Sequence, residues 1–154
     1  MQRAARRSLC IDRRLAMVVS LLYLIAATPA VACSVSVAPL VFGAVDPLSG
    51  ADSDSATSVA IDCDGVVSYS IALSSGGGMA LERVMTSGSA TLAYNLYSDA
   101  SHGLVWGDGT AGTVLVDGID PGTGSTHTVY ARIPPQPQAV PGTYGDSIVV
   151  TVSF

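Results

Sequence analysis

The side chains best suited to catalysis are few in this sequence, and they lie far apart. His102 and His127 are the two histidines, and neither has a cysteine, a histidine or an acid at ligand spacing on its own strand face. No serine occupies the Gly-x-Ser-x-Gly turn that exposes a nucleophilic hydroxyl. The run Gly76-Gly77-Gly78 has no adjoining lysine or arginine and no helix after it, so it predicts a flexible hairpin loop and not a phosphate cradle. We therefore expect no enzyme activity, no cofactor, and solvent-exposed histidines.

Clustered aspartates raise the question of a calcium site, because Ca²⁺ prefers oxygen ligands. Asp52 and Asp54 stand close together, and Asp62 and Asp64 flank Cys63. The spacing does not match an EF-hand, and alternation along a strand would turn both neighbours of Cys63 toward solvent. We expect no metal site here.

The N-terminus predicts export. Five arginines within residues 1–14 precede an apolar run over residues 15–27, and the segment closes with Ala30-Val31-Ala32. A basic start, a short apolar stretch and a small-x-small exit are typical of a secretory signal peptide. The apolar stretch is shorter than the ~20 residues that a resident membrane helix needs. We predict a signal peptide over residues 1–32 and no stable membrane insertion after cleavage, with a signal anchor as the alternative.

Cleavage at that site leaves one domain over residues 33–154, with two of the three cysteines. Because Cys10 lies in the signal peptide, Cys33 and Cys63 form an even pair in an exported chain, which predicts a disulfide. Closing a loop of about 30 residues would stabilise the fold by roughly 3–4 kcal/mol. Lipidation of Cys33 is the alternative, although Ala30 stands where lipid-attachment signals usually carry leucine.

Removal of the signal peptide leaves a strongly acidic domain. Residues 33–154 contain eleven acidic side chains against Arg83 and Arg132 and no lysine, which gives a net charge of −9. Such a surface repels nucleic-acid backbones and anionic lipid headgroups. Nucleic acid is therefore excluded as a partner.

The elements that position these residues read as strands. Apolar residues alternate with small or polar ones at period two, which is typical of half-buried strands. The alternating runs cover residues 35–37, 40–42, 59–63, 67–73, 92–96, 114–116, 129–133 and 148–154. Turn-forming residues separate them at 46–50, 75–78, 107–109 and 121–124. This pattern predicts an all-β, antiparallel sandwich of eight or nine strands in a single domain.

Several ordered motifs lead from these strands to a family. They are Cys33-Ser34-Val35-Ser36, Phe42-Gly43, Asp46-Pro47-Leu48-Ser49, Tyr94-Asn95-Leu96-Tyr97-Ser98-Asp99, Val105-Trp106-Gly107-Asp108-Gly109-Thr110, Val129-Tyr130-Ala131-Arg132-Ile133-Pro134 and Val140-Pro141-Gly142-Thr143-Tyr144-Gly145-Asp146. Over the whole domain, this array resembles the spore coat protein U domain of subunits from archaic (Csu-type) chaperone–usher pili. The family-motif positions carried over are Tyr94, Asn95, Tyr97, Asp99, Trp106, Gly107, Asp108, Gly109, Tyr130, Arg132, Pro134, Pro141, Tyr144 and Asp146.

These motif residues also have a direct physical interpretation. Trp106 and the tyrosines supply large apolar area to a core otherwise built from small residues. Gly107 and Gly109 permit backbone angles that side chains would forbid. Arg132 stands among apolar neighbours, so we expect it to form a buried pair with an acid, whose identity the sequence leaves open.

The resemblance implies an immunoglobulin-like sandwich that lacks one strand, so that a groove and an unpaired sheet edge remain. A periplasmic pilus chaperone, and later a neighbouring subunit, would complete the fold by adding a strand during passage through an outer-membrane usher to the cell surface. The residues expected to border that groove belong to the terminal strand and are Ile148, Val150, Val152 and Phe154.

One departure from the family pattern concerns the donor segment. Polymerising subunits carry a strand-forming extension before the first cysteine, whereas Cys33 follows the cleavage site directly. We therefore expect an acceptor-only, tip-type subunit involved in adhesion or biofilm formation. A secreted spore or cell coat component, or a surface- or carbohydrate-binding module, is the alternative.

Overall fold

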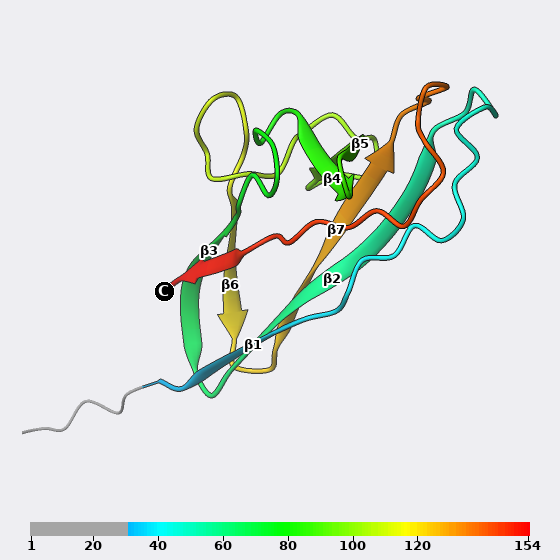
Figure 1. Ribbon diagram of the computed structural model, residues 1–154. Coiled ribbons are helices and arrows are strands. Elements are labelled where there is room, and N and C mark those ends of the chain that lie inside the picture. Colours follow the sequence, from blue (N-terminus) through cyan, green and yellow to red (C-terminus); the bar gives the residue numbers. More distant parts are fainter. Residues whose placement is uncertain (1–30) are drawn as a thin grey trace, which may run out of the picture. The chain divides into compact units, whose positions relative to one another are not determined.

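Two antiparallel sheets face each other across a core of alternating apolar residues (Figure 1). In this computed structural model, residues 31–154 are described, so nearly all of the expected signal peptide lies outside the described residues. The strands are β1 (Cys33–Val37), β2 (Ser53–Cys63), β3 (Val66–Leu73), β4 (Arg83–Ser87), β5 (Ala90–Tyr97), β6 (Val116–Pro121), β7 (Ser125–Ile133) and β8 (Val150–Ser153). Among these residues, no helix is long and apolar enough to cross a membrane.

The two sheets are unequal. One has five strands in the order β1-β2-β7-β5-β4, and the other has three in the order β6-β3-β8. The chain changes sheet at the tight turn between β2 and β3, and again between β3 and β4. Residues 76–78 therefore link the two sheets and do not form the expected hairpin loop.

The core follows the predicted alternation. Val59, Ile61 and Cys63 on β2 are buried, as are Val129, Ala131 and Ile133 on β7. Trp106 is fully buried, and its indole N–H donates to the carbonyl of Ile71 at 3.0 Å. Gly107 follows it without a Cβ because the side chain of Thr113 occupies that space, 2.5 Å from where the atom would lie.

The disulfide prediction is confirmed. Cys33 and Cys63 are opposite one another on β1 and β2 and are bonded at an S–S distance of 2.04 Å. The bond ties the first strand of the domain to the buried end of β2. The flanking Asp62 and Asp64 are exposed, as alternation predicted.

Three expected strand segments are absent or shorter in the structure. Residues 38–52 contain no strand, although residues 40–42 alternate. Val114 makes only an isolated bridge with Trp106, and β8 begins after Ile148. Pro39 lacks an N–H and interrupts the ladder to β2. The segments around residues 40–42 and Ile148 border the same gap between the sheets, where residues 31–154 provide no strand to pair with them.

Candidate functional site: an apolar groove beside unpaired strand edges

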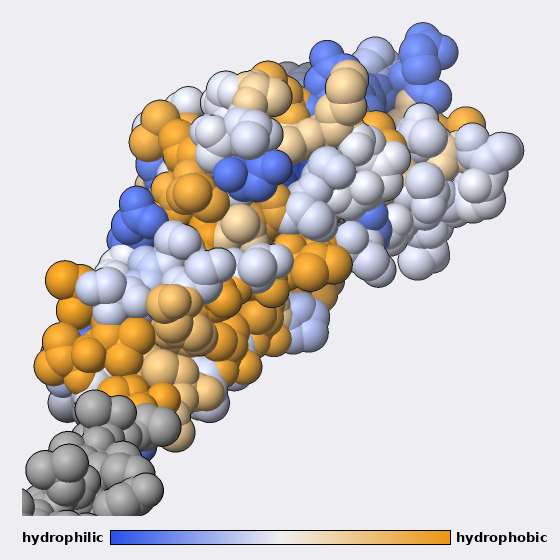
Figure 2. Space-filling view, turned by 90° about the vertical axis from the view of Figure 1, so that its left-hand side faces the viewer, coloured by the Kyte–Doolittle hydropathy of each residue, from blue (hydrophilic) through white to orange (hydrophobic). Residues whose placement is uncertain are grey.

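A long groove runs between the inner face of the five-stranded sheet and the two irregular segments that cross it. Its volume is about 950 Å³, and residues 37–45 and 139–150 form its rims. Its floor comes from β2, β4, β5 and β7, through Val59, Met85, Leu92, Tyr94, Leu96, Val129 and Ile133. Figure 2 shows apolar residues gathered in a band along one side of the molecule.

The groove exists because three strands face five. Val35 and Val37 pair with Ile61 and Val59, and directly opposed residues of an antiparallel pair project from the same face. Ile61 and Val59 are buried, yet Val35 and Val37 are 42% and 48% exposed. These inward-facing valines are uncovered because the three-stranded sheet does not extend over β1.

Both strands that border the gap have an unpaired edge. Within residues 31–154, β8 pairs only with β3, and β1 pairs only with β2. The N–H of Ser74 donates to the carbonyl of Val149, so the backbone of Val149 faces β3. Backbone direction alternates along a strand, so the N–H and C=O groups of Ile148 and Val150 face the groove.

The segment after β1 is attached to the sheet by one backbone hydrogen bond, from the N–H of Ala38 to the carbonyl of Ser58 at 3.2 Å, and by side chains. The hydroxyl of Thr57 donates to the carbonyl of Ala38 at 2.7 Å, and that of Ser55 donates to the carbonyl of Val41 at 2.6 Å. Phe42 packs edge-on against Tyr94, with ring centroids 6.4 Å apart. Residues 38–45 thus form a rim held by few contacts.

Of the four terminal residues expected at the groove, Ile148 and Val150 line it. Ile148, Val150 and Val152 are half-buried and pack against the core, while the intervening Val149 is 63% exposed. Phe154 is 61% exposed, and its ring lies edge-on to that of Tyr69, with centroids 6.5 Å apart.

Beyond the apolar groove, a polar cluster occupies the same inter-sheet layer. The Tyr69 hydroxyl lies 2.6 Å from Nε2 of His127 and 2.7 Å from Oγ of Ser125. Partial burial lowers the pKa of His127, which favours the neutral ring. The expectation of a solvent-exposed His127 was therefore wrong, because the period-two pattern of β7 turns position 127 inward together with Val129.

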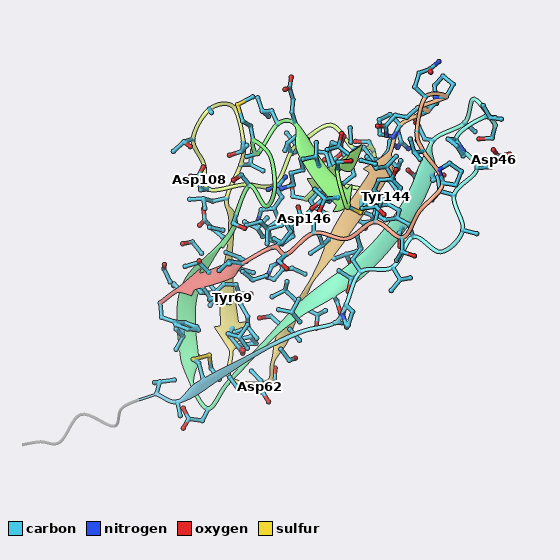
Figure 3. All side chains as sticks on the ribbon, viewed as in Figure 1. Asp46, Asp62, Tyr69, Asp108, Tyr144 and Asp146 are labelled. Carbon is cyan, nitrogen blue, oxygen red and sulfur yellow. A yellow bond between two sulfur atoms is a disulfide. The ribbon has the colours of Figure 1, made fainter. Side chains whose placement is uncertain are left out.

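At the opposite end, a carboxylate joins three segments. Oδ1 of Asp146 accepts the N–H groups of Gly77 at 3.0 Å and Ser147 at 2.8 Å, and Oδ2 accepts the hydroxyl of Tyr94 at 2.7 Å. Burial and this hydrogen bond raise the pKa of Tyr94. Figure 3 shows Asp146 between Tyr144 and β8 on the segment that crosses the sandwich.

A buried arginine lies behind this end, and it is Arg83 and not Arg132. Arg83 is fully buried, and each of its five N–H groups donates to an oxygen. The acceptors are the carbonyls of Ser74, Ala80 and Trp106 and the side-chain Oδ1 of Asn95. Burial lowers the pKa of Arg83, while Tyr94 and Asp146 act in the opposite direction.

Arg132 does pair with acids, as expected, but on a partly exposed face. It binds Asp54 through two N–H···O contacts of 2.7 Å, and its NH1 lies 2.9 Å from Asp52. The side-chain hydrogen bond to Arg132 lowers the pKa of Asp54. The expected buried pair was wrong because Arg132 alternates with the buried Ala131 and Ile133 and so faces outward.

Other motif residues cluster on this outer face or shape turns. His102 is enclosed by Tyr97 and Tyr130, with ring centroids 5.0 and 6.3 Å away, and its side chain is only 8% exposed. His102 was therefore also wrongly expected to be exposed. Asp99 accepts hydrogen bonds from Ser101, Gly103 and Leu104, which lower its pKa to about 2.

The remaining motif residues have local structural roles. Asp108 accepts from Thr110, and Gly109 has a φ of 81°, which favours glycine. Pro141 and Tyr144 line the groove, and Pro134 follows β7 directly. Among residues 31–154, no group of three or more His, Cys, Asp or Glu side chains could hold a metal ion.

Comparison with known families assigns this architecture. The model of the Spore Coat Protein U domain matches residues 19–151. The chain belongs to the Spore Coat Protein U domain family. No curated protein sequence matches it.

A solved structure shows the same fold for this Spore Coat Protein U domain. It is the crystal structure of the CsuC–CsuE chaperone–tip adhesion subunit pre-assembly complex from archaic chaperone-usher Csu pili of Acinetobacter baumannii. The match has a TM-score of 0.61 and 22% identity over 81% of this chain. The chain spans 40% of the length of that matched chain.

Proposed function

We propose that this protein is an exported, non-catalytic pilus subunit whose groove is completed by a strand from a partner. The groove between unpaired edges carries this proposal. Main-chain pairing to an exposed edge supplies affinity, and the side chains that enter the groove supply selectivity. The partners would be a periplasmic chaperone, other pilus subunits and an outer-membrane usher, and the final location would be the cell surface.

The distribution of edge protection supports strand addition at this place. The outer edge of β4 is closed by two hydrogen bonds between Thr86 and Gly145. The edge strand β6 carries Asp117 and ends at Pro121, features that discourage pairing. The edges of β1 and β8 have apolar inward-facing residues and lack comparable protection, as expected for edges that are meant to pair.

Export and family support the cellular setting. A disulfide persists in oxidising compartments such as the bacterial periplasm, which agrees with the Cys33–Cys63 bond. The solved structure with the matching fold is a complex of a chaperone with a tip adhesion subunit. We propose that this chain acts in the same way as an acceptor of strands, in a tip-type position with a role in adhesion or biofilm formation.

Matched charge substitutions on β8 test the groove. Val150→Asp places a carboxylate on the inward face, whereas Thr151→Asp places the same charge one residue away on the exposed face. Covering the buried charge would cost several kcal/mol. We expect Val150→Asp to abolish, and Thr151→Asp to retain, a one-to-one complex with a Csu-type chaperone, measured by co-expression and size-exclusion chromatography.

Two observations would contradict the proposal. A chaperone complex that tolerates Val150→Asp as well as Thr151→Asp would show that the groove is not the binding site. Homopolymers of the purified protein would contradict the acceptor-only role, since that role requires uptake of a donor peptide without chain formation.

A further inference from the structure

Along the segment that leads into and through β8, the row of side chains at alternate positions begins with a charge. Side chains at positions 146, 148, 150, 152 and 154 recur at period two, and all but Asp146 are apolar. A Cβ placed on Gly76 would lie 2.8 Å from both Cγ of Asp146 and Cδ1 of Ile148, so these two side chains are adjacent. Asp146 is also the one charged residue among those that line the groove in the described part of the chain.

The Asp146 carboxylate is held in place but has acceptor capacity left. Its two oxygens provide about four lone-pair sites. Three are used by Gly77, Ser147 and Tyr94, and Oδ2 accepts only the hydroxyl of Tyr94. Asp146 is exposed while the groove is empty, so water can solvate the remaining site.

No cation within residues 31–154 is placed to fill that site. Arg83 directs its five N–H groups to other oxygens, and Arg132 is bound to Asp52 and Asp54 on the outer face. The described residues include no lysine. A strand seated in the groove would therefore desolvate this carboxylate without a direct ion pair from the described residues, since Arg83 acts on Asp146 only through space.

Covering a carboxylate that has no cation in contact with it is costly, and a cation supplied by the partner reduces that cost. We infer that Asp146 selects incoming strands that carry lysine or arginine at the position facing it, with apolar side chains at the alternate positions facing Ile148, Val150 and Val152. This inference rests on the proposed strand-accepting function and adds a charge-reading position to it.

Synthetic peptides of eleven residues test the selection. Each has apolar residues at alternate positions, and one end carries lysine, its uncharged analogue norleucine, or glutamate. A strand can bind in either direction, so one set of peptides carries the test residue at the N-terminal end and a second set carries it at the C-terminal end. For one of the two sets, we expect the lysine peptide to bind about five- to tenfold more tightly than the norleucine peptide, and the glutamate peptide to bind more weakly than both.

A control variant at a second acidic position distinguishes a local contact with Asp146 from the general attraction of a cationic peptide to an acidic protein. Asp146→Asn and Asp62→Asn reduce the net negative charge equally, but Asp62 is exposed near the end of β2, well away from Asp146 in Figure 3. We expect the preference for lysine to vanish in Asp146→Asn and to persist in Asp62→Asn.

The outcomes are distinct. Equal affinity for lysine and norleucine peptides in both sets, measured on the unmodified protein by titration calorimetry, would overturn the inference while leaving strand binding intact. Equal loss of preference in both variants would also overturn it, because only overall charge would then matter. Failure of every peptide to bind, norleucine included, would instead refute the proposed function. The peptide comparison needs no variant, so it holds even if Asp146→Asn folds poorly.

Discussion

Replacement of Arg83 tests whether a buried cation holds the loops behind the groove. All five N–H groups of Arg83 are used, and they bind oxygens from the end of β3, the β3–β4 connection, β5 and Trp106. Lysine keeps the charge but has only three N–H groups. The substitution Arg83→Lys must therefore lose at least two of the five hydrogen bonds.

The structure sets the size of the effect. A hydrogen bond to a charged group contributes about 1.5–3 kcal/mol, so two lost bonds lower the free energy of unfolding by about 3 kcal/mol or more. Domains of this size have a total free energy of unfolding of about 5–15 kcal/mol. Arg83→Met removes the charge but leaves four buried or partly buried acceptors without this donor, and we expect it to be at least as damaging.

Urea unfolding measures these changes, with fluorescence of Trp106 as the reporter. Trp106 is the sole tryptophan and is fully buried, so its emission should change when the core opens. Arg132→Lys is the matched control, because Arg132 is partly exposed and its pairing should matter far less. An Arg83→Met protein as stable as the unmodified one would refute the reasoning, since apolar packing would then replace the cation without loss.

Two further predictions concern the disulfide and acid. Replacing both Cys33 and Cys63 with serine should lower the free energy of unfolding by about 3–4 kcal/mol, measured by denaturation; an unchanged midpoint would contradict the loop-closure argument. Burial lowers the pKa of His127, so the folded state binds its proton less readily than the unfolded state. Stability from this group is therefore present above about pH 6.5 and falls as the pH drops below it. His127→Gln should flatten that part of a stability–pH curve, and an unchanged curve would show that His127 does not cause it.

Much of this architecture could be predicted from local patterns. Period-two alternation identified the inward faces of β2, β5 and β7, because side chains on a strand point alternately to opposite faces. The pairing of Cys33 with Cys63 followed from their number in an exported chain. Alternation also placed Ile148, Val150 and Val152 on one face, since side-chain direction within a strand depends only on its own residues, but Phe154, expected on the same face, is largely exposed.

Contacts between residues of different strands could not be predicted from those local patterns. Arg83 lies outside the alternating runs, yet it meets oxygens from four segments inside the fold. Arg132 lies inside such a run among apolar neighbours, yet it faces outward to Asp52 and Asp54. Alternation with Val129 could have placed His127 inward, but its partner Tyr69 could not be predicted, because Tyr69 comes from the other sheet. Each of these contacts joins residues distant in sequence, so only the assembled sheets bring them together.

The groove shows the same division most clearly. Alternation alone determined that Val35, Val37 and Val150 would face inward. Their exposure depends on the count and order of strands in the opposite sheet, which is a property of the whole fold. Asp146 was visible in the sequence as a motif residue, but its place as the one charge among the described residues that line the groove arises only when β8 lies beside β3 over the inner face of the five-stranded sheet.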